Sequence, residues 1–253
     1  MTHASFARDL MAARREARLL DPKALPAIAN VDDAYNVQTE LAALAGGNVR
    51  GWKVTALTRA DQDKFSSSRA VAGMLLGDYV HPNGATLRLS GLIAPLLECE
   101  IAFVLGADLP ARTEPYARDQ VEAAIAQVVA AFEIPDGRMP DDSALLLKLA
   151  DCMNNGEFIA GQPIAFSRGF DVTNIDITLA HNGKTLERGS SARILNDPLL
   201  AVLALANARP LPAGGLRKGQ VVTTGTCTNP VKLEKGEYTA EFGSLGSVRM
   251  TIV

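Results

Sequence analysis

The most informative stretch of the sequence carries two carboxylates two residues apart, Glu98 and Glu100, at the head of the apolar run Ile101–Val104. The run contains β-branched and aromatic residues without a helical period, so it predicts a buried strand. Side chains alternate between the faces of a strand, and both glutamates should therefore point the same way. Two like charges beside an apolar core are unfavourable unless one is protonated or a cation lies between them. The pair indicates either a divalent-metal site or a strand that exposes both carboxylates to water.

Two polar residues earlier in the chain could carry chemistry. Lys53 stands in a strand-like stretch between Trp52 and Val54. Apolar surroundings can lower the pKa of an amine and suit it to proton transfer, while a charged lysine can hold an anionic substrate. Asp78 is a charged residue among apolar ones, after Gly77. The alternatives are a lysine that reaches the surface and an ordinary turn aspartate.

Two more candidates follow the glutamate pair. Glu133 comes directly after Val121–Phe132, an Ala- and Val-rich run that we expect to be helical. A carboxylate gains nothing from the C-terminal end of a helix dipole, so a cation is expected near it, either a metal or Arg138. Asp151 opens a polar segment that ends in Asn154-Asn155-Gly156, which is also typical of a helix C-cap.

Composition limits the kind of metal and the compartment. The chain has only three histidines and three cysteines, and no two cysteines have the CxxC spacing. A disulfide framework or a zinc site is therefore not expected, and a reducing cytoplasm fits. A metal would be held by oxygen ligands, which favours Mg²⁺, Mn²⁺ or Ca²⁺.

Charge and hydropathy exclude two classes of partner. The net charge is −3 with scattered lysines and arginines, so the sequence predicts no nucleic-acid partner and no anionic membrane surface. The longest apolar runs are too short to span a bilayer. Hydrophobic residues make up 47% of the 253 residues, enough for a sizeable core.

The elements that must position these residues change in kind along the chain. Amphipathic helices are expected over Ala4–Leu20 and Val31–Ala45, the second ended by Gly46-Gly47. From Gly73 onward short strands predominate, with a hairpin turn at 181–184 and a helix opened by Asn196-Asp197-Pro198. The sequence predicts an α+β protein with an N-terminal helical cap over residues 1–50 and a β-rich catalytic core over 51–253.

The order of the motifs resembles one known family. The segments are Gly51-Trp52-Lys53-Val54, Gly73 with Asp78, Glu98-x-Glu100-Ile-Ala-Phe-Val-Leu, Phe132-Glu133-Ile-x-Asp136-x-Arg138 and Ala150-Asp151 with Gly156 and Gly161. Together they resemble the 2-keto-4-pentenoate hydratase family of the fumarylacetoacetate hydrolase superfamily, over about residues 5 to 253.

The resemblance implies a fold and a site. The fold would be a mixed β-roll core with flanking helices, in an oligomer that is expected to be homomeric. Mg²⁺ or Mn²⁺ would be bound by Glu98, Glu100 and Glu133. Lys53, Asp78 and Asp151 would serve in catalysis, and the substrate would contact Lys53, Leu76, Asp136 and Arg138.

The activity implied by the resemblance is hydration of a 2-hydroxy-2,4-dienoate, such as 2-hydroxypenta-2,4-dienoate, to a 4-hydroxy-2-oxo acid in the catabolism of aromatic compounds. Two alternatives stay open. One is metal-dependent decarboxylation of 2-oxo-3-hexenedioate (4-oxalocrotonate). The other is a non-catalytic subunit that associates with an active pathway enzyme.

Overall fold

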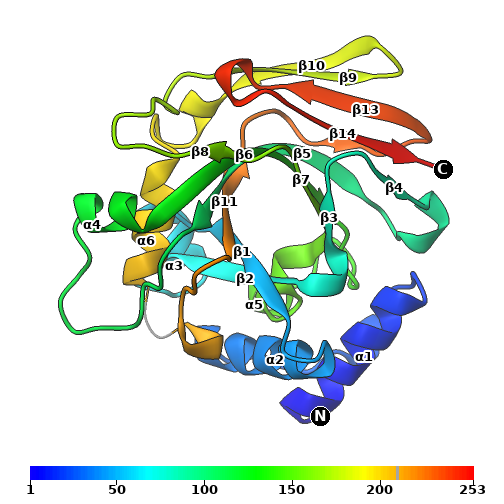
Figure 1. Cartoon of the computed structure of the whole chain (residues 1–253). Helices are drawn as coiled ribbons and strands as arrows, with labels where there is room; N and C mark the ends of the chain where they lie inside the picture. Colours follow the sequence, from blue (N-terminus) through cyan, green and yellow to red (C-terminus); the bar gives the residue numbers. More distant parts are fainter. Residues whose placement is uncertain (209–210) are drawn as a thin grey trace.

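The apolar and β-branched runs of the chain form one large sheet in the computed structural model, which describes residues 1–208 and 211–253 (Figure 1). Most of these strands are buried on both faces, which is why they lack a simple polar–apolar alternation. The strands are β1 (Val49–Thr55), β2 (Val71–Leu76), β3 (Val80–Pro82), β5 (Leu96–Leu105), β6 (Ile125–Pro135), β7 (Asn155–Ala160), β8 (Ile164–Ala165), β11 (Val221–Thr226) and β12 (Val231–Lys232).

The large sheet is mixed and curls back on itself. Its strand order is β2-β1-β11-β5-β6-β7-β3, with β12 beside β5 and β8 beside β6. The pairs β1–β11 and β3–β7 are parallel, and the other pairs are antiparallel. The two ends of this order, β2 and β3, are joined by the short 3₁₀ turn η2 (Gly77–Tyr79), so the opposite margins must lie close together. Figure 1 shows the resulting half-barrel.

The concave side of the half-barrel has its own apolar cluster, separate from the main core. Alternate residues of neighbouring strands supply it, as the period of two in a strand requires. These buried residues are Leu75, Ala102, Val129, Ala131, Phe158 and Val221. The same faces of β5 and β6 carry Glu98, Glu100 and Glu133, so the acidic residues lie at one end of this interior cluster.

The smaller sheet has the order β10-β9-β13-β14-β4 and lies beside the large sheet, at the top of Figure 1. The predicted hairpin joins β9 to β10 through Asn182 and Gly183, whose φ angles of +50° and +76° suit a tight two-residue turn. The hairpin prediction is confirmed. The strands are β4 (Ala85–Leu87), β9 (Asp176–His181), β10 (Lys184–Ser190), β13 (Gly236–Glu241) and β14 (Ser247–Ile252).

Helices cover the large sheet, and α1 and α2 pack together on one side of it (Figure 1). The buried Gln38 side chain of α2 donates to the carbonyls of Ala72 and Leu149, which ties α2 to β2 and α5. The first helix ends at Arg15 and not at Leu20 as predicted. The helices are α1 (His3–Arg15), α2 (Val31–Leu44), α3 (Arg59–Lys64), α4 (Arg118–Ala124), α5 (Leu145–Ala150) and α6 (Leu199–Asn207).

The helix predicted over Val121–Phe132 is wrong for most of its length. Helix α4 ends at Ala124, and β6 begins at Ile125 in the middle of the sheet. Alanine favours helices, but burial between β5 and β7 decides the structure here, because β-branched residues such as Val128 and Val129 pack well in a strand. Glu133 therefore lies within a strand and not at the end of a helix.

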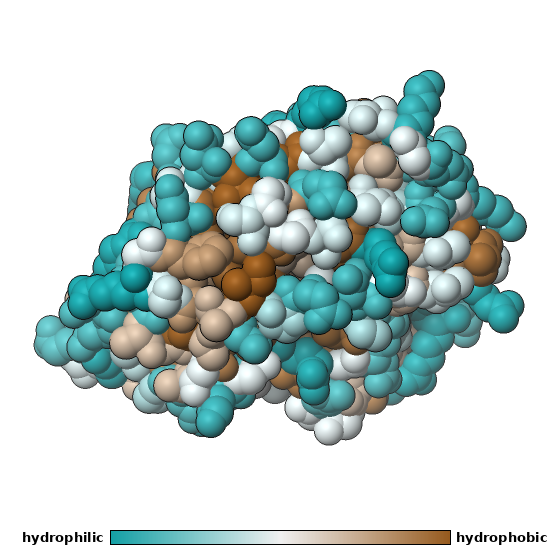
Figure 2. Space-filling view, turned by 45° about the horizontal axis from the view of Figure 1, so that its top comes forward, coloured by the Kyte–Doolittle hydropathy of each residue, from teal (hydrophilic) through white to brown (hydrophobic). Residues whose placement is uncertain are grey.

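The fold is α+β, as predicted, with helices laid on mixed sheets. Within residues 1–208 and 211–253, no helix has both the length and the apolar composition needed to cross a bilayer. Figure 2 shows one face of the molecule, where hydrophobic side chains gather near the middle and hydrophilic side chains cover most of the rim.

Close backbone packing gives a test of this fold. A Cβ added to Gly73 in β2 would lie 2.0 Å from the carbonyl oxygen of Cys152, a backbone atom that cannot move aside alone. We expect Gly73→Ala to lower the free energy of unfolding by about 2 kcal/mol or more, as overpacking does. Gly91→Ala is the matched control, because a Cβ there meets nothing within 4 Å. Urea denaturation of both variants measures the difference, and equal stabilities would contradict the packing described here.

Candidate metal centre

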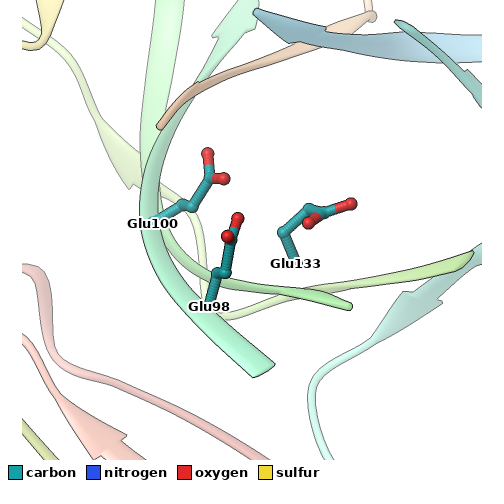
Figure 3. Close-up of side chains that lie close together, drawn as sticks. All are labelled: Glu98, Glu100 and Glu133. Atoms are coloured by element: carbon teal, nitrogen blue, oxygen red, sulfur yellow. The ribbon is translucent and has the colours of Figure 1, made fainter. Parts of the chain in front are cut away.

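The register between β5 and β6 brings three carboxylates together. Glu98 is paired directly with Glu133 across the two antiparallel strands, and Glu100 lies two residues further along β5 on the same face. Figure 3 shows the three side chains pointing toward a common space inside the curled sheet. One oxygen from each carboxylate lies within 4.8 Å of the others. The arrangement can hold a metal ion through oxygen ligands alone.

The three glutamates differ in their exposure to solvent. The side chain of Glu98 is 16% exposed, whereas Glu100 and Glu133 are completely buried. Glu100 Oε2 accepts a 2.8 Å hydrogen bond from the backbone N–H of Gly225. Glu100 Oε1 has no hydrogen-bond partner among the described residues, and nor does Thr223 Oγ1 on the neighbouring strand β11. A buried carboxylate oxygen without a partner is costly, and a bound cation would satisfy it.

Lys53 contacts two of the three glutamates. Its Nζ lies 2.6 Å from Glu133 Oε2 and 3.8 Å from Glu98 Oε2. Strand β1 places it there, because Lys53 is paired with Thr223 of β11, which is in turn paired with Ala102 of β5. Three carboxylates against one ammonium leave an excess of two negative charges when all four groups are ionised. A single divalent cation would balance that excess.

The pKa values reflect this uncompensated charge. Burial, and after it repulsion from Glu98, raises the pKa of Glu100 to about 7. Burial also raises the pKa of Glu133 to about 8, although Lys53 opposes the shift. Burial alone would lower the pKa of Lys53, but the three glutamates outweigh it and the pKa is raised. The lysine is therefore favoured as the ammonium and not as the neutral amine that the sequence left open.

A second layer of charged residues lies behind the centre, formed by Arg138 and Asp151. A guanidinium has five N–H donors, and here each has a protein acceptor: Asp151 Oδ1 for Nε and Nη2, the Asp151 carbonyl for Nη2, and the carbonyls of Asp136 and Asn155 for Nη1. Asp151 Oδ2 also accepts from the backbone N–H of Arg138. Both side chains are 2% exposed. The polar groups of both side chains are engaged within the protein, and the roles of Arg138 in substrate binding and of Asp151 in catalysis stay predictions.

Three other predicted residues do not join the cluster. The carboxylate of Asp136 accepts from the backbone N–H groups of Ile93 and Ala94, so it anchors a loop. Leu76 belongs to the main core, whereas its neighbour Leu75 faces the interior of the half-barrel. Asp78 is exposed, five residues beyond Gly73, which is the residue paired with Lys53. No contact described for Asp78 joins it to Lys53 or to the three glutamates.

Two residues at the centre were missed from the sequence. Asn155 is fully buried, and its Nδ2 donates to Glu133 Oε1 at 2.9 Å. Gly225 supplies the N–H that binds Glu100, with a φ of +110° that favours glycine. The segment that contains Asn155 is also typical of a helix C-cap, so its residue types do not single out Asn155 as a neighbour of Glu133. A glycine that donates through its backbone leaves no side-chain signal at all.

Comparison with known proteins places the chain in a family. Residues 71–253 match the family model described as fumarylacetoacetate (FAA) hydrolase C-terminal. The chain is 34% identical over 223 residues to a 2-keto-4-pentenoate hydratase of Burkholderia vietnamiensis, with 86% of this chain and 84% of that protein covered. It is 28% identical over 227 residues to a 4-oxalocrotonate decarboxylase of Pseudomonas putida, with 87% and 85% covered.

The fold agrees with a solved structure of the same group. The 4-oxalocrotonate decarboxylase of Pseudomonas putida G7, in complex with calcium and acetate, aligns with a TM-score of 0.84 and 25% identity over 99% of this chain and 97% of that chain. The family model and the hydratase relative each cover most of the sequence, and they confirm the resemblance seen in the motifs. The chain belongs to the fumarylacetoacetate hydrolase superfamily and, within it, to the 2-keto-4-pentenoate hydratase family.

Proposed function

We propose that this chain is a divalent-metal-dependent hydratase that converts a 2-hydroxy-2,4-dienoate, such as 2-hydroxypenta-2,4-dienoate, into a 4-hydroxy-2-oxo acid. The observation that carries the proposal is the cluster of Glu98, Glu100 and Glu133, whose fully ionised form has two excess negative charges beside Lys53 and whose Glu100 Oε1 has no partner among the described residues. The 34% identity to a 2-keto-4-pentenoate hydratase supports the reaction.

The metal in the proposal is Mg²⁺ or Mn²⁺, held by one or more oxygens of the three glutamates. Carboxylate oxygens suit these hard cations, and neither histidine nor cysteine joins the described cluster. The solved decarboxylase structure contains calcium, another cation that prefers oxygen ligands. When bound, the cation would act as a Lewis acid on the C1 carboxylate and C2 oxygen of the substrate.

Lys53 is the residue proposed to carry protons in the reaction. The dienol gains a proton at C5 and loses the proton of its C2 hydroxyl, which gives an unsaturated ketone. Water then adds, with its hydrogen at C3 and its hydroxyl at C4. The lysine ammonium lies 12% exposed at the edge of the cluster, where it can contact substrate and donate a proton or hold an anionic oxygen. Asp151 and Arg138 do not contact the substrate in this proposal, since their charged groups are paired with each other. They support the centre from behind.

The hydratase is favoured over the decarboxylase by the surroundings of the centre. The substrate of the decarboxylase has a second carboxylate, which needs a cationic or polar partner. The interior beside the glutamates is apolar, with residues such as Ala102, Ala131 and Phe158, and the guanidinium of Arg138 is fully used. The identity to the hydratase also exceeds the identity to the decarboxylase, 34% against 28%. We also propose that the chain forms a homo-oligomer in the cytoplasm and associates with another enzyme of its pathway.

Metal binding is testable without any substrate. Wild-type protein freed of metal with EDTA should bind Mn²⁺ at one site per chain in a calorimetric titration. Glu100→Gln should abolish measurable binding, because it removes one negative charge from a buried ligand. Glu157→Gln is the control, since Glu157 lies on β7 and pairs with His81 outside the cluster. Tight Mn²⁺ binding by Glu100→Gln would contradict the assignment of this ligand.

The reaction itself is testable by absorbance. Purified protein with Mg²⁺ should consume 2-hydroxypenta-2,4-dienoate, seen as loss of the dienol absorbance, and Glu98→Gln should lose this activity. Turnover of 2-oxo-3-hexenedioate without turnover of the dienoate would favour the decarboxylase. Failure to turn over both substrates by protein that binds Mn²⁺ would favour the non-catalytic subunit.

The role of Lys53 predicts a separation of binding and turnover. Lys53→Met should lower kcat by about 10²- to 10⁴-fold, the usual contribution of a positioned proton donor. Mn²⁺ binding should persist, because removal of the ammonium leaves the carboxylates in place and even favours a cation. Lys64→Met, which removes a surface pair with Asp61, should keep full activity. An unchanged kcat in Lys53→Met would refute the proposed role.

A further inference from the structure

Asn155 fixes the orientation of a carboxylate in the centre. Its Nδ2 donates to Glu133 Oε1 at 2.9 Å, while Glu133 Oε2 faces Lys53 at 2.6 Å. The two oxygens of Glu133 are thus assigned to different partners, and the carboxylate cannot rotate freely about its terminal bond. Asn155 is completely buried at the start of β7, so water cannot replace this hydrogen bond.

Arg14 of the N-terminal helix α1 holds Asn155 in turn. Its Nη2 donates to the backbone carbonyl of Asn155 and to the carbonyl of Gly156 at 2.7 Å. It also lies 3.4 Å from Asn155 Oδ1, which leaves the amide nitrogen facing Glu133. The guanidinium stacks 3.7 Å above the ring of Tyr79, which restricts its movement. Arg14 thus contributes to both the position and the orientation of the amide.

The backbone just before Asn155 is strained. Cys152, Met153 and Asn154 have φ angles of +52°, +55° and +58°, a left-handed conformation that costs energy for residues other than glycine. The turn is retained because the backbone N–H of Asp136 binds the Asn154 carbonyl at 2.7 Å and Arg138 binds the carbonyl of Asn155 at 2.9 Å. Its result is to direct the Asn155 side chain toward Glu133.

We propose that Asn155 and Arg14 are positioning residues for the metal centre: Asn155 orients Glu133 as a ligand, and Arg14 orients Asn155 from the N-terminal helix. The inference rests on the proposed metal-binding function. It gives helix α1, which lies outside the matched family region 71–253, an effect on metal affinity through Asn155. Hydrogen-bonding partners of metal ligands typically contribute 10- to 100-fold in affinity or activity.

The test is Mn²⁺ affinity, measured by calorimetry and by the loss of the free Mn²⁺ signal in electron paramagnetic resonance. Asn155→Leu keeps the approximate shape and removes the donor, and should weaken binding about 10- to 100-fold. Arg14→Met should weaken binding by a smaller factor, and Arg14→Lys should restore part of it. In the double variant Asn155→Leu/Arg14→Met, the second change should add nothing, because Arg14 acts through Asn155.

The control separates positioning from stability. Gln38→Met also removes a buried amide that bridges two backbone carbonyls, but Gln38 does not contact the glutamates. It should lower Tm and leave the Mn²⁺ affinity of the folded protein unchanged. Wild-type affinity in both Asn155→Leu and Arg14→Met would overturn the inference, as would equal losses in Gln38→Met. Absence of Mn²⁺ binding in the wild-type protein would instead refute the proposed function.

Discussion

The pairing of Glu98 with Glu133 across β5 and β6 is the constraint on which the rest of the structure depends. Like charges that face each other across two paired strands destabilise a sheet. Two unit charges of the same sign about 4 Å apart repel by about 4 kcal/mol at an intermediate dielectric constant. Packing of the apolar residues around them fixes this register, because a slip of one residue would turn Ala102 and Val129 out of the interior. The folded protein thus carries an unfavourable electrostatic free energy at this pair, which the Lys53 ammonium offsets only in part.

The arrangement around this pair divides the polar groups into two sets. Near the concave side, Lys53 and Glu98 stay partly exposed and can meet a ligand. Behind them, Arg138 and Asp151 are buried and mutually satisfied, and loss of one partner would leave an uncompensated charge in the core. Asn155 connects the two sets, since its side chain donates to Glu133 and its carbonyl accepts from Arg138. Lys53 and Glu98 are thus available to a ligand, whereas Arg138 and Asp151 are engaged with each other.

The sequence was sufficient for the parts of the site that obey simple periodicity. Glu98 and Glu100 follow the period of two in a strand, and their shared face could be predicted from spacing alone. The order of the motifs was enough to predict that Glu133 joins the site. Its secondary structure was not predictable, because the Ala-rich stretch Ile125–Phe132 resembles a helix until its burial between two strands is known. Sheet order, which pairs Trp52 of β1 with Val222 of β11, 170 residues later in the chain, has no local signal. Nor does the saturation of Arg138, which depends on carbonyls brought together by folding.

The contacts at the centre also set the order in which it can form during synthesis. Glu100 needs the N–H of Gly225, 125 residues later, and Asn155 needs Arg14, 141 residues earlier. A nascent chain that has emerged only as far as β7 has all three glutamates but no donor for Glu100 and no β11 between β1 and β5. Such non-local contacts form late, because the chain loses the entropy of closing a long loop before the contact can stabilise it. The complete cation-binding geometry therefore arises only after β11 has emerged from the ribosome, so a bound cation stabilises the folded centre and does not start its folding.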